Sequence, residues 1–147
     1  MTDGPPDALA SRLGYLLKHA QQQLMQAAGP AMAPFGVDGR ELAVLTVLAA
    51  AFPLSQQEAA EQLGVDRTTM VALIDALEVR GLVERHRSPE DRRKNIVQLT
   101  SAGKDRLREA GKARDEVERD FLAPLGAELA RQFVRALQIL VSARAPD

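Results

Sequence analysis

The chain has 147 residues, of which 46% are hydrophobic and 27% charged, with a net charge of −1. This length is typical of one domain with a sizeable buried core. The absence of cysteine excludes disulfides and thiolate chemistry, and only two histidines, far apart in the sequence, argue against a metal site or an enzyme. No apolar run approaches the ~20 residues that cross a bilayer. We therefore expect a soluble, cytoplasmic protein that is no enzyme and has no cofactor or metal.

The first predicted helix runs from about Asp7 to Ala28 and ends at Gly29-Pro30. Leucines and alanines at helical spacing give it a continuous apolar face. Tyr15 and His19 are four residues apart, so they share one side of this helix. One interpretation is that they are ordinary residues at the edge of a core, with their polar tips in water. The other is that they belong to a polar binding site.

Two further helices are predicted before residue 64. One runs from about Arg40 to Ala51, with Asp38 as its cap. The next is capped by Ser55, which has Glu58 three residues on, a pattern typical of a capping box. This helix is short and ends before Gly64, so a tight turn is expected there.

The fourth predicted helix is the centre of the pattern. Asp66 is suited to its N-cap, and Gly81 is suited to the left-handed position that follows its end. One side carries an apolar stripe with spacing i, i+3, i+4, i+7, which predicts burial of that side. The members of this stripe are Met70, Leu73, Ile74 and Leu77.

The other side of this helix carries Arg67, Thr68 and Thr69 at its start and Val71 and Ala72 further along. The first residues of a recognition helix are the ones that meet base edges in DNA. An arginine can bind guanine with two hydrogen bonds, and a threonine methyl can contact thymine. The alternative is an ordinary amphipathic helix with a solvated polar end.

A β-hairpin is predicted next, with strands Leu82–His86 and Asn95–Leu99. Its loop, Arg87–Lys94, has eight residues, which exceeds the roughly 2–5 of ordinary hairpin loops. Helix, tight turn, helix and hairpin together make a winged helix-turn-helix. Such a unit places one helix in a DNA major groove and a charged loop beside the backbone.

Charge is unevenly distributed along the chain. Residues 80–94 contain six Arg or Lys and three Asp or Glu, a net charge of +3, whereas the other residues contain thirteen and seventeen, a net charge of −4. A basic wing on an acidic molecule favours contact with phosphates. We expect Asp91 to hold one guanidinium of Arg92 or Arg93 while another reaches the DNA. The alternative is a solvated run of charges.

Two helices follow the hairpin. The first is capped by Thr100 and runs from about Ser101 to Leu122, and Pro124 ends it. The last, about Leu125–Val141, carries more apolar surface than one winged helix can cover. The first helix and these two are therefore expected to interlock with those of a second chain. Burial against the first helix of the same chain is the alternative.

Five motifs follow one another along the central part of the chain. They are Leu54-Ser55-Gln56 with Ala59, Leu63-Gly64-Val65, Asp66-Arg67-Thr68-Thr69, Leu77-Glu78 with Gly81-Leu82-Val83, and Asp91-Arg92-Arg93 leading to Leu99-Thr100-Ser101-Ala102-Gly103. Together with the flanking helices they resemble the MarR family of bacterial regulators, and the resemblance covers nearly the whole chain. Family members often carry polar or basic residues where this chain has Val71 and Ala72, so we expect only apolar contact with a thymine methyl there.

The resemblance implies a mainly α fold with a small β-hairpin wing, as one MarR-like domain over residues 1–147. Dimerisation helices are expected at 1–30 and 101–147, and a winged helix-turn-helix lobe at 38–100. The implied function is that of a homodimeric transcriptional repressor. It binds a pseudo-palindromic operator in double-stranded DNA and is released by a small ligand, such as an aromatic acid. The alternative is a winged-helix module that binds a protein without specific DNA binding.

Two sets of residues are candidates for these contacts. The resemblance places a ligand cleft near the first helix, where Arg12, Tyr15 and His19 offer a cation, a stacking ring and a titratable donor. The candidates for DNA binding come from the two helices of the helix-turn-helix and from the wing. They are Ser55, Gln56, Asp66, Arg67, Thr68, Thr69, Val71, Arg87, Asp91, Arg92, Arg93 and Lys94.

Overall fold

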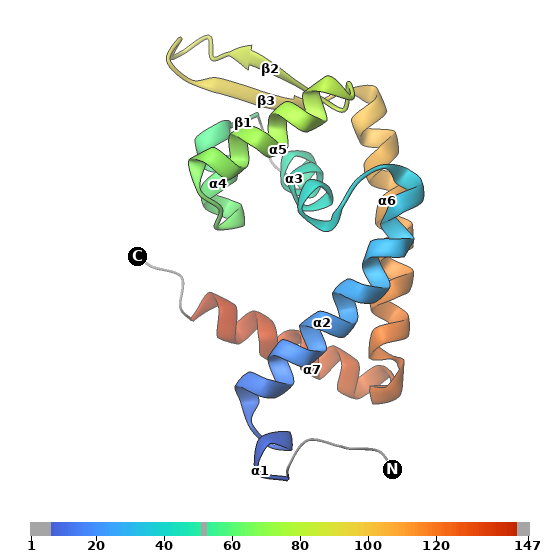
Figure 1. Ribbon diagram of the computed structural model, residues 1–147. Helices are drawn as coiled ribbons and strands as arrows, with labels where there is room; N and C mark the ends of the chain where they lie inside the picture. Colours follow the sequence, from blue (N-terminus) through green and yellow to red (C-terminus); the bar gives the residue numbers. More distant parts are fainter. Residues whose placement is uncertain (1–6, 51–52, 144–147) are drawn as a thin grey trace.

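The structure is a computed structural model, and it describes residues 7–50 and 53–143. Helices dominate the chain, and three short strands form one sheet (Figure 1). In chain order the elements are α1 (Asp7–Ala10), α2 (Leu13–Met32), η1 (Ala33–Phe35), α3 (Gly39–Ala50), β1 (Leu54–Ser55), α4 (Gln56–Leu63), α5 (Arg67–Val79), β2 (Val83–Arg87), β3 (Asn95–Leu99), α6 (Ser101–Leu122), η2 (Ala123–Leu125) and α7 (Gly126–Ser142).

The chain has two regions that α6 connects. Figure 1 shows α3, α4, α5 and the sheet gathered into one lobe, with the hairpin at its outer edge. The long helix α6 leaves this lobe beside the hairpin and runs to the opposite end of the molecule, where α7 follows. Helix α2 packs against α6. The predicted fold class, mainly helical with a small β wing, is confirmed.

The sheet contains one strand that the sequence pattern missed. Its order is β1-β3-β2, and both pairings are antiparallel. β1 has only two residues, Leu54 and Ser55, and Leu54 lies opposite Val97 of β3. The hairpin register pairs Arg87 with Asn95, so the wing loop contains residues 88–94. Two residues are too few for an alternating pattern, so only the pairing with β3 reveals β1.

The prediction of one first helix that ends at Gly29-Pro30 was wrong at both ends. The backbone is extended at Arg12 (φ −81°, ψ 125°), so α1 is a separate turn. Helix α2 continues through Pro30 to Met32. A proline removes one backbone donor, but here that loss falls in the last turn. Burial of Met32, which is only 2% exposed, favours continuation of the helix into the core.

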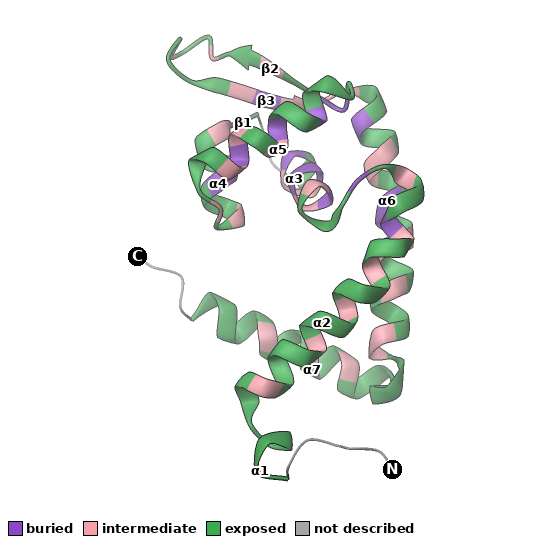
Figure 2. Ribbon diagram, viewed as in Figure 1, coloured by how far each residue is buried: buried purple, intermediate pink, exposed green. Residues whose placement is uncertain are grey.

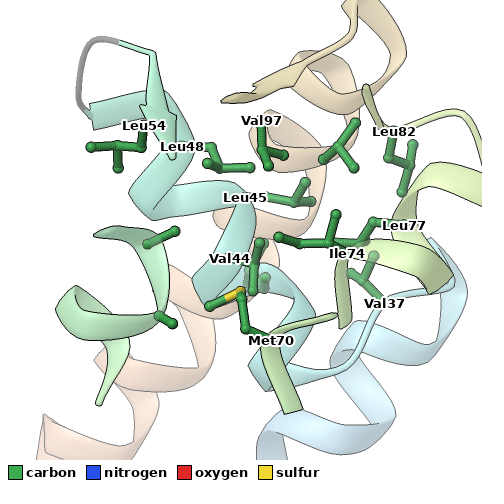
Figure 3. Close-up of a cluster of buried hydrophobic side chains, with 14 of the residues drawn as sticks. Val37, Val44, Leu45, Leu48, Leu54, Met70, Ile74, Leu77, Leu82 and Val97 are labelled. Atoms are coloured by element: carbon green, nitrogen blue, oxygen red, sulfur yellow. The ribbon is translucent and has the colours of Figure 1, made fainter. Parts of the chain in front are cut away.

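The hydrophobic core lies in the lobe. Figure 2 places the buried residues mainly in α3, α4, α5 and the sheet, and Figure 3 shows their side chains converging between these elements. The predicted stripe of α5 faces this core, with Met70, Ile74 and Leu77 fully buried and Leu73 half-buried. The other fully buried large side chains are Met32, Val44, Leu45, Leu82, Val83 and Val97.

Helix α7 has no such cover. None of its residues is buried, although its sequence is strongly amphipathic (Figure 2). Leu129 and Leu140 are 50% and 59% exposed, and on α2 Leu13 and Leu16 are 66% and 47% exposed. Among the described residues, the last helix is therefore not buried against the first helix of the same chain, which was the alternative to a dimer.

Apart from the first helix, the predicted helix starts agree with the structure to within about one residue at the caps. Asp38 and Glu41 exchange hydrogen bonds between side chain and backbone at the start of α3. Ser55 Oγ accepts from the Glu58 amide at 3.1 Å, and Thr100 Oγ1 accepts from the Gly103 amide at 3.0 Å. The predicted end of the α3 helix at Ala51 lies outside the described residues. No described helix combines the length and the apolar composition that crossing a membrane needs.

Candidate DNA-binding interface

The turn between α4 and α5 positions the start of α5. Gly64 adopts a left-handed conformation (φ 65°), which a residue without a Cβ enters at little cost. Asp66 then caps α5, and its two carboxylate oxygens accept from the Thr69 amide at 2.7 Å and the Thr69 hydroxyl at 3.0 Å. These bonds leave Arg67 and Thr68 exposed on the first turn, where a recognition helix meets base edges.

This cap makes the stability of α5 dependent on pH. Hydrogen bonds to the Asp66 carboxylate, first from the Thr69 amide and then from its hydroxyl, lower the pKa of Asp66 below its ordinary 3.8. A lowered pKa stabilises the folded state above 3.8, and this stabilisation is lost as the pH falls through the lower, folded value.

Asp66→Ala is therefore expected to destabilise the protein at neutral pH and to have progressively less effect below pH 3.8. Urea-unfolding midpoints of the wild type and the variant, measured at neutral pH and at a series of acidic pH values, check this convergence. If the difference between the two midpoints stayed constant down the series, the cap would not be held by an ionised carboxylate.

A groove of about 550 Å³ lies between the start of α4, the start of α5 and the wing. Six of the predicted DNA-binding residues line it, although they come from three separate parts of the sequence. They are Ser55, Gln56, Arg67, Asp91, Arg93 and Lys94. The groove is also lined by Glu61 and Asn95, which the sequence analysis missed. Their only signals are the i, i+4 spacing of Gln57 and Glu61 on α4 and the position of Asn95 directly after the basic loop.

The wing loop is held in one conformation by its own hydrogen bonds. The Ser88 amide donates to the Lys94 carbonyl at 3.0 Å, and the Lys94 amide donates to the Asp91 carbonyl at 3.0 Å. Asp91 Oδ1 accepts from the Arg93 amide at 3.0 Å and from Arg93 Nε at 3.3 Å. The predicted contact between Asp91 and one guanidinium is confirmed, and Arg93 is the partner. The Arg93 side chain remains 91% exposed, so its terminal nitrogens point to solvent.

Two of the cations counted in the basic stretch have partners inside the lobe. Arg80 pairs with the Glu41 carboxylate and donates to the Gly36 carbonyl. Arg85 pairs with carboxylates of α5. The other four cations of this stretch remain available in the wing. They are Arg87, Arg92, Arg93 and Lys94.

The remaining candidates lie outside this groove. Asp66 and Thr69 are hydrogen-bonded to each other. Thr68, Val71, Arg87 and Arg92 do not line the groove. Contact of any candidate residue with DNA, inside or outside the groove, stays a prediction.

Two of the ligand candidates, Tyr15 and His19, form a separate cluster on α2, and the third, Arg12, directly precedes this helix. The rings of Tyr15 and His19 have centroids 4.1 Å apart and are tilted by 39°. Tyr15 is half-buried, whereas His19 and Arg12 are exposed. The cluster does not line the groove at α5. The predicted role of these residues stays a prediction.

Known proteins share both the sequence pattern and the fold. The family model described as "MarR family" matches residues 35–94. The HTH-type transcriptional regulator YdgJ of Bacillus subtilis is 30% identical over 69% of this chain, and the chain spans 62% of its length. The structure of the transcriptional repressor CouR bound to a 23-mer DNA duplex is similar with a TM-score of 0.86 and 33% identity, covering 96% of this chain and 99% of that one. The PcaV transcriptional regulator of Streptomyces coelicolor, in complex with its natural ligand, is similar with a TM-score of 0.79 and 28% identity, covering 97% and 99%.

Proposed function

Because the chain belongs to the MarR family and is a transcriptional regulator rather than an enzyme, we propose that it is a homodimeric repressor that binds a pseudo-palindromic operator in double-stranded DNA. The observation that carries this proposal is the groove in which the starts of α4 and α5 meet the wing. The likeness to CouR, whose structure contains a DNA duplex, supports it.

The roles of the candidate DNA-binding residues follow from their position and chemistry. Arg67 and Thr68, on the exposed first turn of α5, read base edges in the major groove. The wing cations bind phosphates, and Arg93 extends from its Asp91 anchor toward the adjacent minor groove. Phosphate contacts supply most of the affinity, whereas α5 supplies the sequence preference.

The dimer follows from the exposed apolar surface. Residues 1–30 and 101–147 would supply the dimerisation helices, and residues 38–100 the winged helix-turn-helix lobe. Leu129 and Leu140 of α7 and Leu13 of α2 are all at least half exposed among the described residues. An exposed apolar surface of this kind is typical of a protein–protein interface. Twofold symmetry would then place two copies of α5 in successive major grooves.

Selection from a random pool of double-stranded DNA tests this function. The purified full chain should enrich a pseudo-palindrome whose half-sites are centred about one helical turn, ~34–36 Å, apart. Enrichment of no sequence would contradict the proposal. It would favour a winged helix that serves a protein partner.

Arg93→Ala is expected to weaken binding to the selected duplex by about 10-fold and to reduce the salt slope by about one, because one phosphate or minor-groove contact is lost. Fluorescence anisotropy over a range of salt concentrations measures both quantities. Arg40→Ala is the matched control, since Arg40 is an exposed arginine of the same lobe at the start of α3. Equal affinities of the wild type and Arg93→Ala would show that the wing does not contact DNA there.

We also infer that a small aromatic acid binds near Arg12, Tyr15 and His19 and releases the DNA. The adjacent rings of Tyr15 and His19 support this inference, as does the likeness to PcaV in complex with its natural ligand. Such a ligand can lower operator affinity only by as much as its affinities for the two conformations differ.

His19→Ala is expected to raise the ligand concentration needed for release while leaving the affinity for DNA alone unchanged. Release of the selected duplex by a panel of benzoates and cinnamates, followed by anisotropy, measures both. Gln21→Ala, an exposed change on the other side of the same helix, is the control. Identical release curves for the wild type and His19→Ala would remove His19 from the site.

A further inference from the structure

Arg85, in the middle of β2, connects three elements of the lobe. Its guanidinium lies 2.6 Å from Asp75 Oδ1 and 3.0 Å from Glu78 Oε1, both on α5. Its Nε donates to Gln56 Oε1 of α4 at 3.2 Å, and one terminal nitrogen lies 3.5 Å from the Val71 carbonyl. The backbone amide of Arg85 also donates to Glu78 Oε2 at 3.3 Å. One strand residue thus holds two turns of α5 and the start of α4.

The position of Arg85 does not suit a phosphate contact. Its side chain is only 18% exposed, and two carboxylates balance its single charge. Its donors are directed at protein acceptors within the lobe. A cation neutralised in this way releases few counterions from DNA, so it adds little to sequence-independent affinity.

The elements that Arg85 joins are those that line the protein groove between α4, α5 and the wing. Gln56 lines that groove directly, and α5 carries Arg67 into it. β2 continues into the wing loop that carries Arg93. The separation between the base-reading turn and the wing therefore depends on how β2 is held against α5. A planar arginine fork fixes that relation better than a single point charge does.

We propose that Arg85 is a positioning residue for sequence discrimination, which locks the recognition helix, the start of α4 and the wing into one rigid DNA-reading unit. The inference rests on the proposed function. Base readout needs side chains held within about 0.5 Å of their productive geometry. Phosphate attraction is far less sensitive to geometry, so loss of Arg85 should lower specificity without lowering general affinity for DNA.

Arg85→Met and Arg87→Met form a matched pair of variants in β2. Arg87 is exposed, and it has no ion-pair partner among residues 7–50 and 53–143. Arg85→Met should reduce the ratio of affinities for the selected and scrambled duplexes by about 10-fold, with the scrambled affinity and the salt slope unchanged. Arg87→Met should weaken binding to both duplexes and lower the slope by about one, with the ratio unchanged.

Asp75→Asn gives a second test, for which simple electrostatics and the proposed role of Arg85 predict different results. It removes a negative charge from the recognition helix, so simple electrostatics predicts tighter binding to every DNA. If Asp75 instead anchors Arg85, the ratio of the two affinities should fall. Asp75 is 57% exposed, so this variant remains informative if Arg85→Met does not fold, which circular dichroism detects. Arg85→Lys, which keeps the charge but loses the fork, should also lower the ratio.

The outcomes separate the inference from the function on which it rests. A wild-type protein that does not distinguish the two duplexes would overturn the proposed function and this inference with it. A wild type that distinguishes them, together with unchanged ratios in Arg85→Met, Arg85→Lys and Asp75→Asn, would overturn the inference alone. Parallel weakening of both affinities in Arg85→Met, with a smaller salt slope, would make Arg85 a phosphate ligand and would also overturn it.

Discussion

Gly103→Ala is expected to destabilise the protein by about 3 kcal/mol, the largest effect of any single methyl group that we predict. A Cβ at this position would lie 2.0 Å from the carbonyl oxygen of Leu82 and 3.0 Å from its carbonyl carbon. Both are backbone atoms, so movement of a flexible side chain cannot relieve the clash.

The surroundings of Gly103 prevent relief of this clash. The Leu82 carbonyl accepts from the Thr100 amide at 3.1 Å, and Leu82 itself is only 1% exposed. Thr100 in turn donates to the Gly81 carbonyl at 2.6 Å and caps α6 through the Gly103 amide. Moving α6 away would break these bonds at the junction between the lobe and α6.

Gly111→Ala is the matched control for Gly103→Ala. Gly111 is also a buried glycine of α6, but its added Cβ would meet only the Arg114 guanidinium at 3.8 Å, an ordinary contact. This variant should be neutral or stabilised by up to about 1 kcal/mol, because alanine favours the helix. Urea unfolding followed by circular dichroism measures both variants. Equal stabilities of Gly103→Ala and Gly111→Ala would contradict the close approach of α6 to Leu82.

The double variant Leu129→Glu/Leu140→Glu is expected to be monomeric and to bind the selected duplex about 10²- to 10⁴-fold more weakly, because a monomer loses the effective concentration of its second half-site. Both side chains are at least half exposed in the single chain, at 50% and 59%, so the substitutions leave the core of the lobe intact. Two charges in an apolar interface are costly to bury.

Light scattering and anisotropy measure the two consequences of this variant. The wild type should have twice the 15.9 kDa of one chain, and the variant should have the mass of one. Gln132→Glu/Gln138→Glu adds the same charge to exposed positions of α7 outside its leucines and is expected to stay dimeric. A dimeric Leu129→Glu/Leu140→Glu variant with unchanged affinity would show that α7 does not form the interface.

Local chemistry explains why the sequence predicts the helix-turn-helix well. Ser55, Asp66 and Thr100 each cap a helix through a side chain that acts within three residues, so their effects can be read from the sequence. Gly64 and Gly81 both adopt the left-handed conformation expected after a helix. These caps also set the start of α5. The region of the protein groove between α4, α5 and the wing was therefore predictable.

Long-range pairing explains what the sequence could not predict. β1 exists only because Leu54 pairs with Val97, 43 positions later in the chain. Helix α2 continues past Pro30 because Met32 is buried in the core of the lobe, against the local preference of proline.

Long-range pairing also divides the cations of the basic stretch, residues 80–94, into two groups. Arg85 is counted in the basic stretch, but in the fold it is paired with Asp75 and Glu78 of α5. Arg80, which was also counted, is paired with Glu41. A count along the chain cannot separate cations that hold the lobe together from those that reach a partner, since only tertiary distances make that distinction.

The most direct test of the central claim is the affinity of the wild-type protein for the selected duplex and for a scrambled duplex, measured by fluorescence anisotropy from about 50 to 200 mM salt. The groove between α4, α5 and the wing predicts at least ~10³-fold tighter binding to the selected duplex and an affinity that falls steeply with salt. Equal affinities for the two duplexes, or affinities that do not change with salt, would contradict the claim that this groove reads DNA.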